Sequence, residues 1–169
     1  MEGGKRMTNL KEQYVKFADS VNLIVRYACI VFFSIMVIDV VASVVMRYVL
    51  VKPMVWGEQL AVYCMIWIAF LSSSIAFRRG AHMGLDLLVK SLDPKLSSII
   101  QSIAHVMVLG FLLVLTVWGV KHTVAVSQQI SPVVFNMSMS WFYSALPVGG
   151  ICMMIQEVEV IIKGTEEDM

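Results

Sequence analysis

Four apolar stretches, each about as long as a membrane is thick, occupy most of this chain of 169 residues. They cover residues 22–46, 59–77, 97–120 and 142–162. A hydrocarbon core about 30 Å thick needs about 20 helical residues, each adding about 1.5 Å of rise. All four stretches reach that length, and 59% of the residues are hydrophobic. The sequence therefore predicts an all-α, polytopic membrane protein whose four transmembrane helices belong to a single membrane domain, residues 1–169.

The Lys and Arg residues are unevenly distributed among the segments outside the four stretches. With Arg26 set aside, nine lie before the first stretch, between the second and third, or after the fourth, and three lie in the other two connections. Positively charged residues concentrate in the cytoplasmic segments of membrane proteins. The aromatic residues Trp56, Trp118 and Trp141 fall at the opposite boundary, as an interfacial belt requires. We therefore expect both termini to be cytoplasmic.

Two shorter segments are amphipathic instead of continuously apolar. In residues 1–21, apolar residues recur every three or four positions, and Lys11 and Lys16 lie off that stripe. In residues 83–92, leucines line one side and charged residues the other. Helices of this kind lie along a membrane surface. We expect the first segment to lie on the inner membrane face and run into the first span, and the second to lie nearly flat on the same face.

Asp39 is the only ionisable residue deep in the first span, eight residues before Arg47. An uncompensated carboxylate in hydrocarbon is costly, so its side chain has to face protein or water. One interpretation is proton or cation coupling. The other is a hydrogen-bonded anchor between helices, with Trp67 of the second span at a suitable depth to donate. We favour the anchor, because coupling sites need more than one polar group at the same depth.

Three further ionisable residues lie in the third and fourth spans. His105 has no second histidine at matching depth, so a satisfied polar contact is a better interpretation than a bis-histidine haem site. Glu157 and Glu159 lie near the inner end of the fourth span. We expect them to be solvated or to pair with Lys or Arg.

Small residues four positions apart predict places where helices approach closely. They are the pairs Ala69/Ser73 and Ser72/Ala76 in the second span, and Gly149-Gly150 in the fourth is expected to act in the same way. No nucleophile–base pair, metal-ligand cluster or phosphate-binding loop is evident in the sequence. We therefore expect no enzymatic activity, no metal and no cofactor.

Several motifs between the first span and the surface segment form a recognisable pattern. The second helix opens with Trp56-Gly57-Glu58, and Arg-x-Gly-x-His-x-x-x-Asp spacing follows it at Arg78, Gly80, His82 and Asp86. Further matching motifs are Arg47-Tyr48, Trp67-Ile68-Ala69-Phe70-Leu71 and Trp141-Phe142-Tyr143. Together they resemble the small membrane subunit of the tripartite ATP-independent periplasmic (TRAP) transporters. The chain has Glu58-Gln59 where that family often has two acidic residues in succession.

The resemblance implies an auxiliary role in transport. Such a subunit associates with a large multi-helix permease subunit of the elevator type and braces it, and a periplasmic substrate-binding protein delivers the substrate. Transport is then secondary and sodium-driven, and it takes up organic acids such as C4-dicarboxylates, keto acids or sialic acids across the bacterial inner membrane. Membrane lipids are further expected contacts, and nucleic acid is not.

Two groups of candidate site residues follow from the resemblance together with the residue pattern. Candidates for contact with a second subunit or with lipid are Asp39, Arg47, Trp56, Glu58 and Trp67. Candidates for fixing the turn into the surface helix are Arg78, Gly80, His82 and Asp86.

A second function, from a different class, competes with this interpretation. The chain would then be a small four-helix, proton-coupled exporter that acts as a homodimer, with Asp39 as the coupling carboxylate. That hypothesis predicts transport by this chain alone and polar groups facing Asp39.

Overall fold

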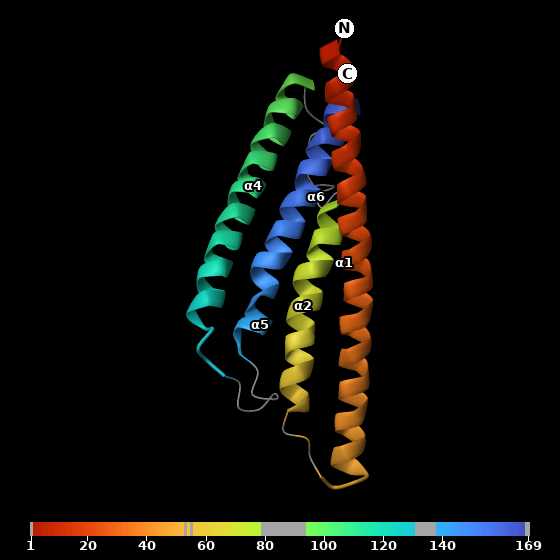
Figure 1. The fold of residues 1–169 in the computed structure, drawn as a ribbon, viewed down its shortest axis with the longest axis vertical. Helices are drawn as coiled ribbons and strands as arrows, with labels where there is room; N and C mark the ends of the chain where they lie inside the picture. Colours follow the sequence, from red (N-terminus) through yellow and green to blue (C-terminus); the bar gives the residue numbers. More distant parts are fainter. Residues whose placement is uncertain (1, 53, 55, 79–93, 131–137, 168–169) are drawn as a thin grey trace.

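The computed structural model describes residues 2–52, 54, 56–78, 94–130 and 138–167. Its helices are α1 (Glu2–Tyr48), α2 (Gly57–Arg78), α4 (Pro94–Ala125), α5 (Ser140–Tyr143) and α6 (Ala145–Glu167). Apart from one isolated bridge, all regular structure in these residues is helical, which confirms the all-α prediction. The long helices run along one axis with both chain termini at one end, here named the terminal end (Figure 1). The opposite end, where α1 connects to α2 and α4 to α5, is named the loop end.

Within the described ranges, four helical segments are long and apolar enough to cross a membrane, which confirms the predicted number of spans. They are Lys11–Tyr48, Gly57–Arg78, Ile99–Ala125 and Ser140–Ile162. The last contains both α5 and α6, which are separated at Ser144. The break has a simple cause, because Pro147 has no N–H to donate to the carbonyl of Tyr143, four residues earlier.

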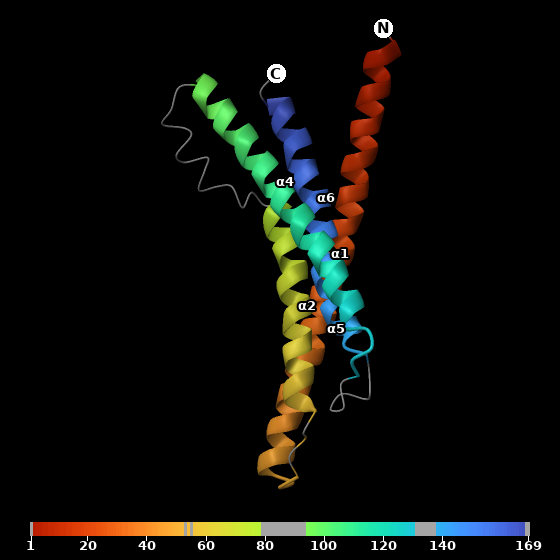
Figure 2. The ribbon, with the colours of Figure 1, turned by 90° about the vertical axis from the view of Figure 1, so that its left-hand side faces the viewer.

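The first helix is longer than the hydropathy pattern suggested. It continues without a break over 47 residues, which corresponds to about 70 Å of length. The sequence contains no glycine or proline between Gly4 and Pro53, so nothing ends the helix at the boundary expected near residue 21. Residues 2–21 therefore continue the axis of the span instead of turning across it (Figure 2). The second amphipathic segment, residues 83–92, lies outside the described residues.

The end of α1 is closed by an unusual backbone conformation. Val51 has a φ of 53°, a region that β-branched residues rarely adopt. The N–H of Lys52 donates to the carbonyl of Met46 at 3.0 Å and so reaches back over this residue. The chain reverses here within a few residues and enters α2.

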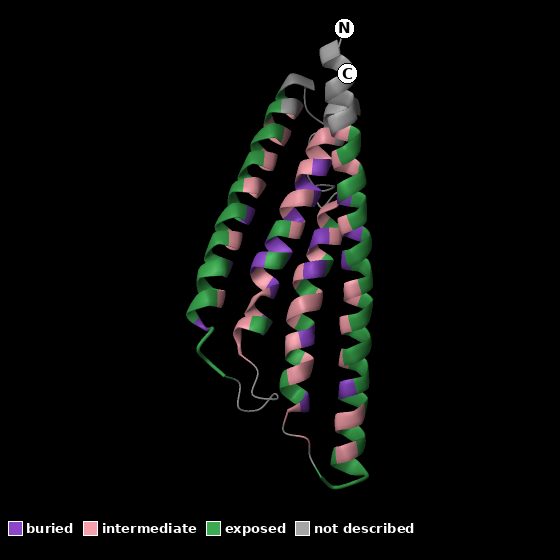
Figure 3. Ribbon diagram, viewed as in Figure 1, coloured by how far each residue is buried: buried purple, intermediate pink, exposed green. Residues whose placement is uncertain are grey.

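The last helix, α6, connects the others. It packs on α1, α2, α4 and α5, and α1 also packs along α2. In the described part of the chain, α4 does not pack directly on α1. Of the membrane-length windows, 44% of the last span is buried but only 6% of the first and 11% of the third. The helices thus form an open layer whose outer members, α1 and α4, are largely exposed (Figure 3).

Two adjacent glycines let α6 approach both of its neighbours. A Cβ on Gly149 would lie 2.6 Å from the Cβ of Phe70 on α2, and a Cβ on Gly150 would lie 2.4 Å from Oγ1 of Thr116 on α4. Both distances are shorter than real carbon contacts. The predicted role of Gly149-Gly150 in close helix packing is therefore confirmed.

The connection between α4 and α5 is held closed at its base. The Ser138 hydroxyl donates to the carbonyl of Ser127 at 2.9 Å, and the Ser140 hydroxyl donates to the carbonyl of Thr123 at 3.0 Å. The middle of this loop, residues 131–137, lies outside the described residues.

Candidate functional site

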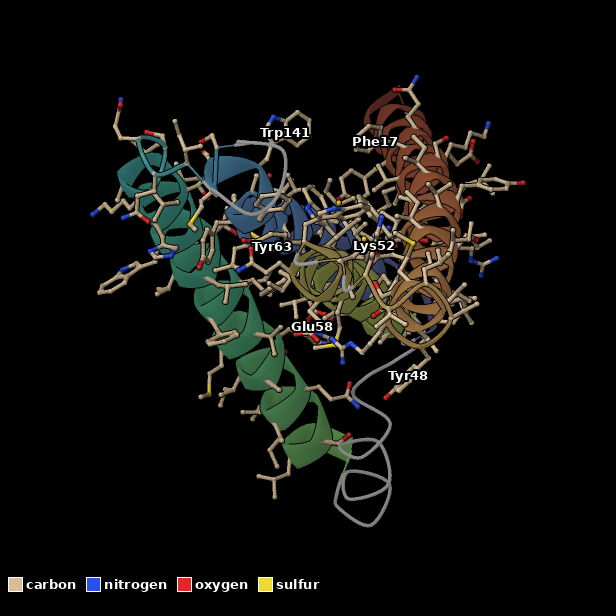
Figure 4. All side chains as sticks on the ribbon, turned by 90° about the horizontal axis from the view of Figure 1, so that it is seen from below. Phe17, Tyr48, Lys52, Glu58, Tyr63 and Trp141 are labelled. Carbon is tan, nitrogen blue, oxygen red and sulfur yellow. The ribbon has the colours of Figure 1, made fainter. Side chains whose placement is uncertain are left out.

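An ion pair joins α1 to α2 at the loop end. Nη2 of Arg47 lies 2.6 Å from Oε1 of Glu58. The two side chains are 51% and 75% exposed. Exposed pairs of this kind contribute about 0–1 kcal/mol to stability, so the pair does little to hold the fold. Figure 4 shows Glu58 and Tyr48 on one side of the molecule, with Phe17 and Trp141 on the other.

A cavity of about 340 Å³ lies between α1 and α2 next to this pair. Beyond the pair itself, its lining includes Asp39, Val40, Ser43 and Val44 from α1, and Gly57 and Ala61 from α2. We name it the α1–α2 cavity. Most of these side chains are apolar or small, and the polar groups among them are those of Asp39 and Ser43.

Asp39 is buried in this cavity without a partner. The residue is only 6% exposed. Both of its carboxylate oxygens, and the hydroxyl of Ser43 one turn later, are buried without a hydrogen-bond partner among the described residues. Asp39 lies eight residues before Arg47, about 12 Å along the helix axis. A carboxylate at such a depth in hydrocarbon costs several kcal/mol unless a donor reaches it.

The expected donor from α2 does not reach Asp39. The ring of Trp67 instead stacks on Phe32, with centroids 5.3 Å apart and planes 12° apart. Phe32 lies seven residues before Asp39, so Trp67 is about 10 Å too deep along α1. Trp56 is half-buried just before α2 and is outside the cavity lining. Of the five predicted contact residues, the structure therefore brings together Asp39, Arg47 and Glu58.

One side of α2 is exposed along its whole length. Apart from Gln59 in the first turn, the exposed positions recur every three or four residues and are Glu58, Val62, Met65, Ala69, Ser72 and Ala76. In the half nearer the terminal end these residues are small. Of the predicted contact pairs Ala69/Ser73 and Ser72/Ala76, only Ser73 is half-buried, and the other three residues are left exposed by the described helices of this chain. A small, smooth surface of this kind suits a helix from a different chain.

A second cavity flanks this exposed stripe on the side of α4. It has a volume of about 320 Å³, and its lining includes Ala69, Phe70 and Ser73 from α2, Phe111 and Leu115 from α4, and Met153 from α6. The α1–α2 cavity lies on the other side, so the stripe has a hollow on each flank. We name the stripe with its two cavities the α2 face.

The terminal end contains a buried polar cluster. Nη2 of Arg78, the last residue of α2, lies 3.0 Å from Oε1 of Glu159 on α6 and also contacts the carboxylate of Asp19 on α1. Nδ1 of His105 on α4 lies 2.8 Å from Oε1 of Glu157. The two glutamates are 1% and 0% exposed. The cluster thus links all four long helices through charged and polar side chains.

These contacts test the expectations for His105, Glu157 and Glu159. The polar contact predicted for His105 is confirmed, and so is pairing with Arg for Glu159. The alternative that the two glutamates are solvated is wrong, because α4 and α2 supply partners that bury them. Their position inside an apolar span was the available signal, since ionisable residues there usually face other helices.

Arg78 is the only one of the four predicted turn residues that the structure describes. It points back into the helix layer, toward Asp19 and Glu159. Gly80, His82 and Asp86 lie outside the described residues, so their grouping with Arg78 stays a prediction. Within the described ranges, no group of three or more His, Cys, Asp or Glu residues could hold a metal ion.

Comparison with known protein families agrees with these features. The family model described as "Tripartite ATP-independent periplasmic transporters, DctQ component" matches residues 35–167. The chain belongs to this family. The match includes Asp39, the whole of α2 and the buried glutamates of α6. With four membrane-length helices, this DctQ-family member is a multi-pass membrane protein.

Curated relatives carry names from the same class of transporter. The chain is 28% identical over 118 residues to the sialic acid TRAP transporter small permease protein SiaQ of Vibrio cholerae, covering 68% of this chain and 66% of that protein. It is 32% identical over 92 residues to a putative TRAP transporter small permease protein of Haemophilus influenzae, covering 54% and 57%. It is 25% identical over 119 residues to the H. influenzae sialic acid TRAP transporter permease protein SiaT, covering 70% and 19%. The chain therefore spans less than two thirds of the length of each of these relatives.

Proposed function

We propose that this protein is the auxiliary small membrane subunit of a sodium-driven, binding-protein-dependent secondary transporter for organic acids. In this proposal it braces a large elevator-type permease subunit. The observation that carries the proposal is the α2 face, where a stripe of small and apolar residues between two cavities is left uncovered by the described helices of this chain. Association of helices in membranes depends on such closely packing small residues.

The distribution of charge supports a bracing role over a transport path. The sequence of α2 contains no charged residue between Glu58 and Arg78. That of α1 contains none between Arg26 and Asp39. Ionisable groups near the terminal end are instead tied to one another across helices, as Arg78 is to Glu159. A layer whose helices are fixed by buried ion pairs suits a static support.

The proposed substrate class, membrane location and partners rest on the family, and the proposed orientation rests on the charge pattern. Two of the relatives are named as sialic acid transporter proteins, which supports an organic acid as substrate. We place the protein in the bacterial inner membrane with both termini in the cytoplasm, because Lys and Arg gather on the side of the termini. The partners are then the large permease subunit and a periplasmic substrate-binding protein.

The test is purification of the tagged full-length chain from its native membrane in mild detergent, with mass spectrometry of the proteins that accompany it. We expect a polytopic partner in stoichiometric amount. Vesicles containing both proteins, supplied with the binding protein and a sodium gradient, should take up labelled sialic acid or succinate, and vesicles with either membrane protein alone should not. A homodimer that transports by itself, with proton-linked activity lost in Asp39→Asn, would establish the exporter instead.

A second test addresses the place of contact. Reversing the charge with Glu58→Lys breaks the pair with Arg47 and puts a cation at the edge of the α2 face, so recovery of the large subunit should fall. Glu12→Lys is the matched control, because Glu12 is also exposed but lies on α1 toward the terminal end. Equal recovery with both variants would remove Glu58 from the interface.

A further inference from the structure

We infer that the α1–α2 cavity receives a lysine or arginine side chain from a transmembrane helix of the large permease subunit, and that this side chain pairs with Asp39. The inference deepens the proposed function and rests on it. It assigns to the buried carboxylate a role in recognising one particular partner.

The starting point is a pair of polar groups left unsatisfied at one place. Asp39 is 6% exposed, and neither carboxylate oxygen has a hydrogen-bond partner in the described part of the chain. The hydroxyl of Ser43, one turn along the same helix, is in the same condition. Buried acceptors are nearly always satisfied in native proteins, and a carboxylate in hydrocarbon needs a partner more than any neutral group does.

Among the described residues, no donor is hydrogen-bonded to the Asp39 carboxylate. Opposite it, α2 presents Gly57, where a Cβ would come within 2.2 Å of the Ser43 hydroxyl and 3.5 Å of Oδ1 of Asp39. The two helices therefore approach closely without any side chain from α2 filling the space. The nearest cation on α1, Arg47, is engaged with Glu58 at 2.6 Å. Asp39 thus has no basic partner among the described residues.

The composition of the lining favours a protein side chain over a metal ion. Asp39 and Ser43 together offer three oxygens, and hard divalent cations take about six or more. Besides Tyr48 and the Arg47–Glu58 pair, the rest of the lining is apolar or small and includes Val40 and Val44. An aliphatic stem lying on valines with its charged tip at a carboxylate is how lysine and arginine bury themselves.

Position also connects the cavity to the proposed contact surface. Glu58 belongs both to the cavity lining and to the exposed stripe of α2. A helix lying on the α2 face would therefore pass over the opening of the cavity. Complementary charge at that point would fix its register and depth, since an alignment that leaves a buried charge unpaired is costly.

The first experiment is site-specific photo-crosslinking in native membranes that contain the full transporter. A photoreactive residue at Val40, in the cavity lining, should crosslink to the large subunit at a helix segment containing a lysine or arginine. The same residue at Ile38 is the matched control, because Ile38 lies at nearly the same depth and is 68% exposed outside the lining. The control should crosslink mainly to lipid. Crosslinking of Val40 to lipid alone would overturn the inference.

The second experiment separates recognition from folding. Asp39→Leu removes an unsatisfied buried carboxylate, so the isolated chain should melt at the same temperature or higher in detergent. Recovery of the large subunit should nevertheless fall at least about tenfold, because its cation is left unpaired. Asp39→Asn, which keeps the shape, should lower recovery in the same direction. Changing the crosslinked lysine or arginine to leucine together with Asp39→Leu should restore recovery.

The outcomes distinguish this inference from the proposed function. If the unaltered chain recovers no large subunit, the proposed function fails and the inference fails with it. If the unaltered chain and Asp39→Leu recover the large subunit equally, the proposed function stands and the inference is wrong.

Discussion

The guanidinium of Arg78 and the carboxylate of Glu159 meet at 3.0 Å in the interior of the helix layer, although they are 81 residues apart in sequence. Arg78 ends α2, and Glu159 lies on α6 with 1% of its surface exposed. The same guanidinium also contacts Asp19 of α1. One cation thus holds two carboxylates from two other helices, at the end of the molecule where the layer is otherwise open.

Replacing this cation should destabilise the fold. In Arg78→Met, Glu159 stays in a buried position without its charged partner, and removing one member of a buried pair costs about 3–5 kcal/mol. We expect a clearly lower melting temperature for the isolated chain in detergent. Arg47→Met is the control, because its pair with Glu58 is exposed and contributes about 0–1 kcal/mol. Similar losses for the two variants would contradict the structural role of the buried pair.

The contact between α6 and α2 gives a second stability prediction. In Gly149→Ala, the new methyl group would lie 2.6 Å from the Cβ of Phe70 and 3.3 Å from its carbonyl oxygen, so the two helices have to separate. Overpacking of this kind costs about 1–3 kcal/mol. Gly110→Ala on α4 meets no atom within 4 Å and should leave the melting temperature unchanged or slightly raised. The comparison is made by thermal unfolding of the purified chain.

The number of spans was predictable because it depends on local composition. Length and hydropathy define the membrane-crossing segments, and the glycine pair in α6 indicated close packing before any contact was known. The unbroken course of α1 was also contained in the sequence, which has no glycine or proline between Gly4 and Pro53. The amphipathic pattern of residues 1–21 competes with this signal, because such a pattern is typical of a separate surface helix.

The partners of buried charges were harder to predict, because they depend on which helices are neighbours. Glu159 could be assigned a basic partner in general, but only the packing of α6 against α2 selects Arg78. Counting residues from the ends of the two spans predicts that Trp67 lies at the same depth as Asp39. A difference of about two helical turns in relative depth put it against Phe32 instead. Sequence gives the depth of a residue along its own helix and leaves the register between helices undetermined.

The proposed orientation in the membrane can be tested by chemical labelling. Lys52 lies at the loop end and Glu12 on α1 toward the terminal end, and both are exposed. With Lys52→Cys, an impermeant maleimide added to cells with a permeable outer membrane should label the chain. With Glu12→Cys, labelling should require disruption of the inner membrane. The native cysteines lie within the spans, so the unaltered chain should not be labelled and serves as the negative control. The reverse pattern would place the termini outside.

A substitution on the α2 face should impair assembly with the large subunit without affecting folding of the isolated chain. Ala69 is exposed near the middle of α2, so Ala69→Phe should fit without disturbing the isolated chain and leave its melting temperature nearly unchanged. A partner helix that packs closely on small residues would meet the new ring, and recovery of the large subunit should fall severalfold or more. Met107→Phe on α4 is the control, because Met107 is 70% exposed and lies outside the α2 face. If Ala69→Phe and Met107→Phe co-purify equally well with the large subunit, the partner helix does not lie on α2 and the contact has to be sought on another exposed face of the layer.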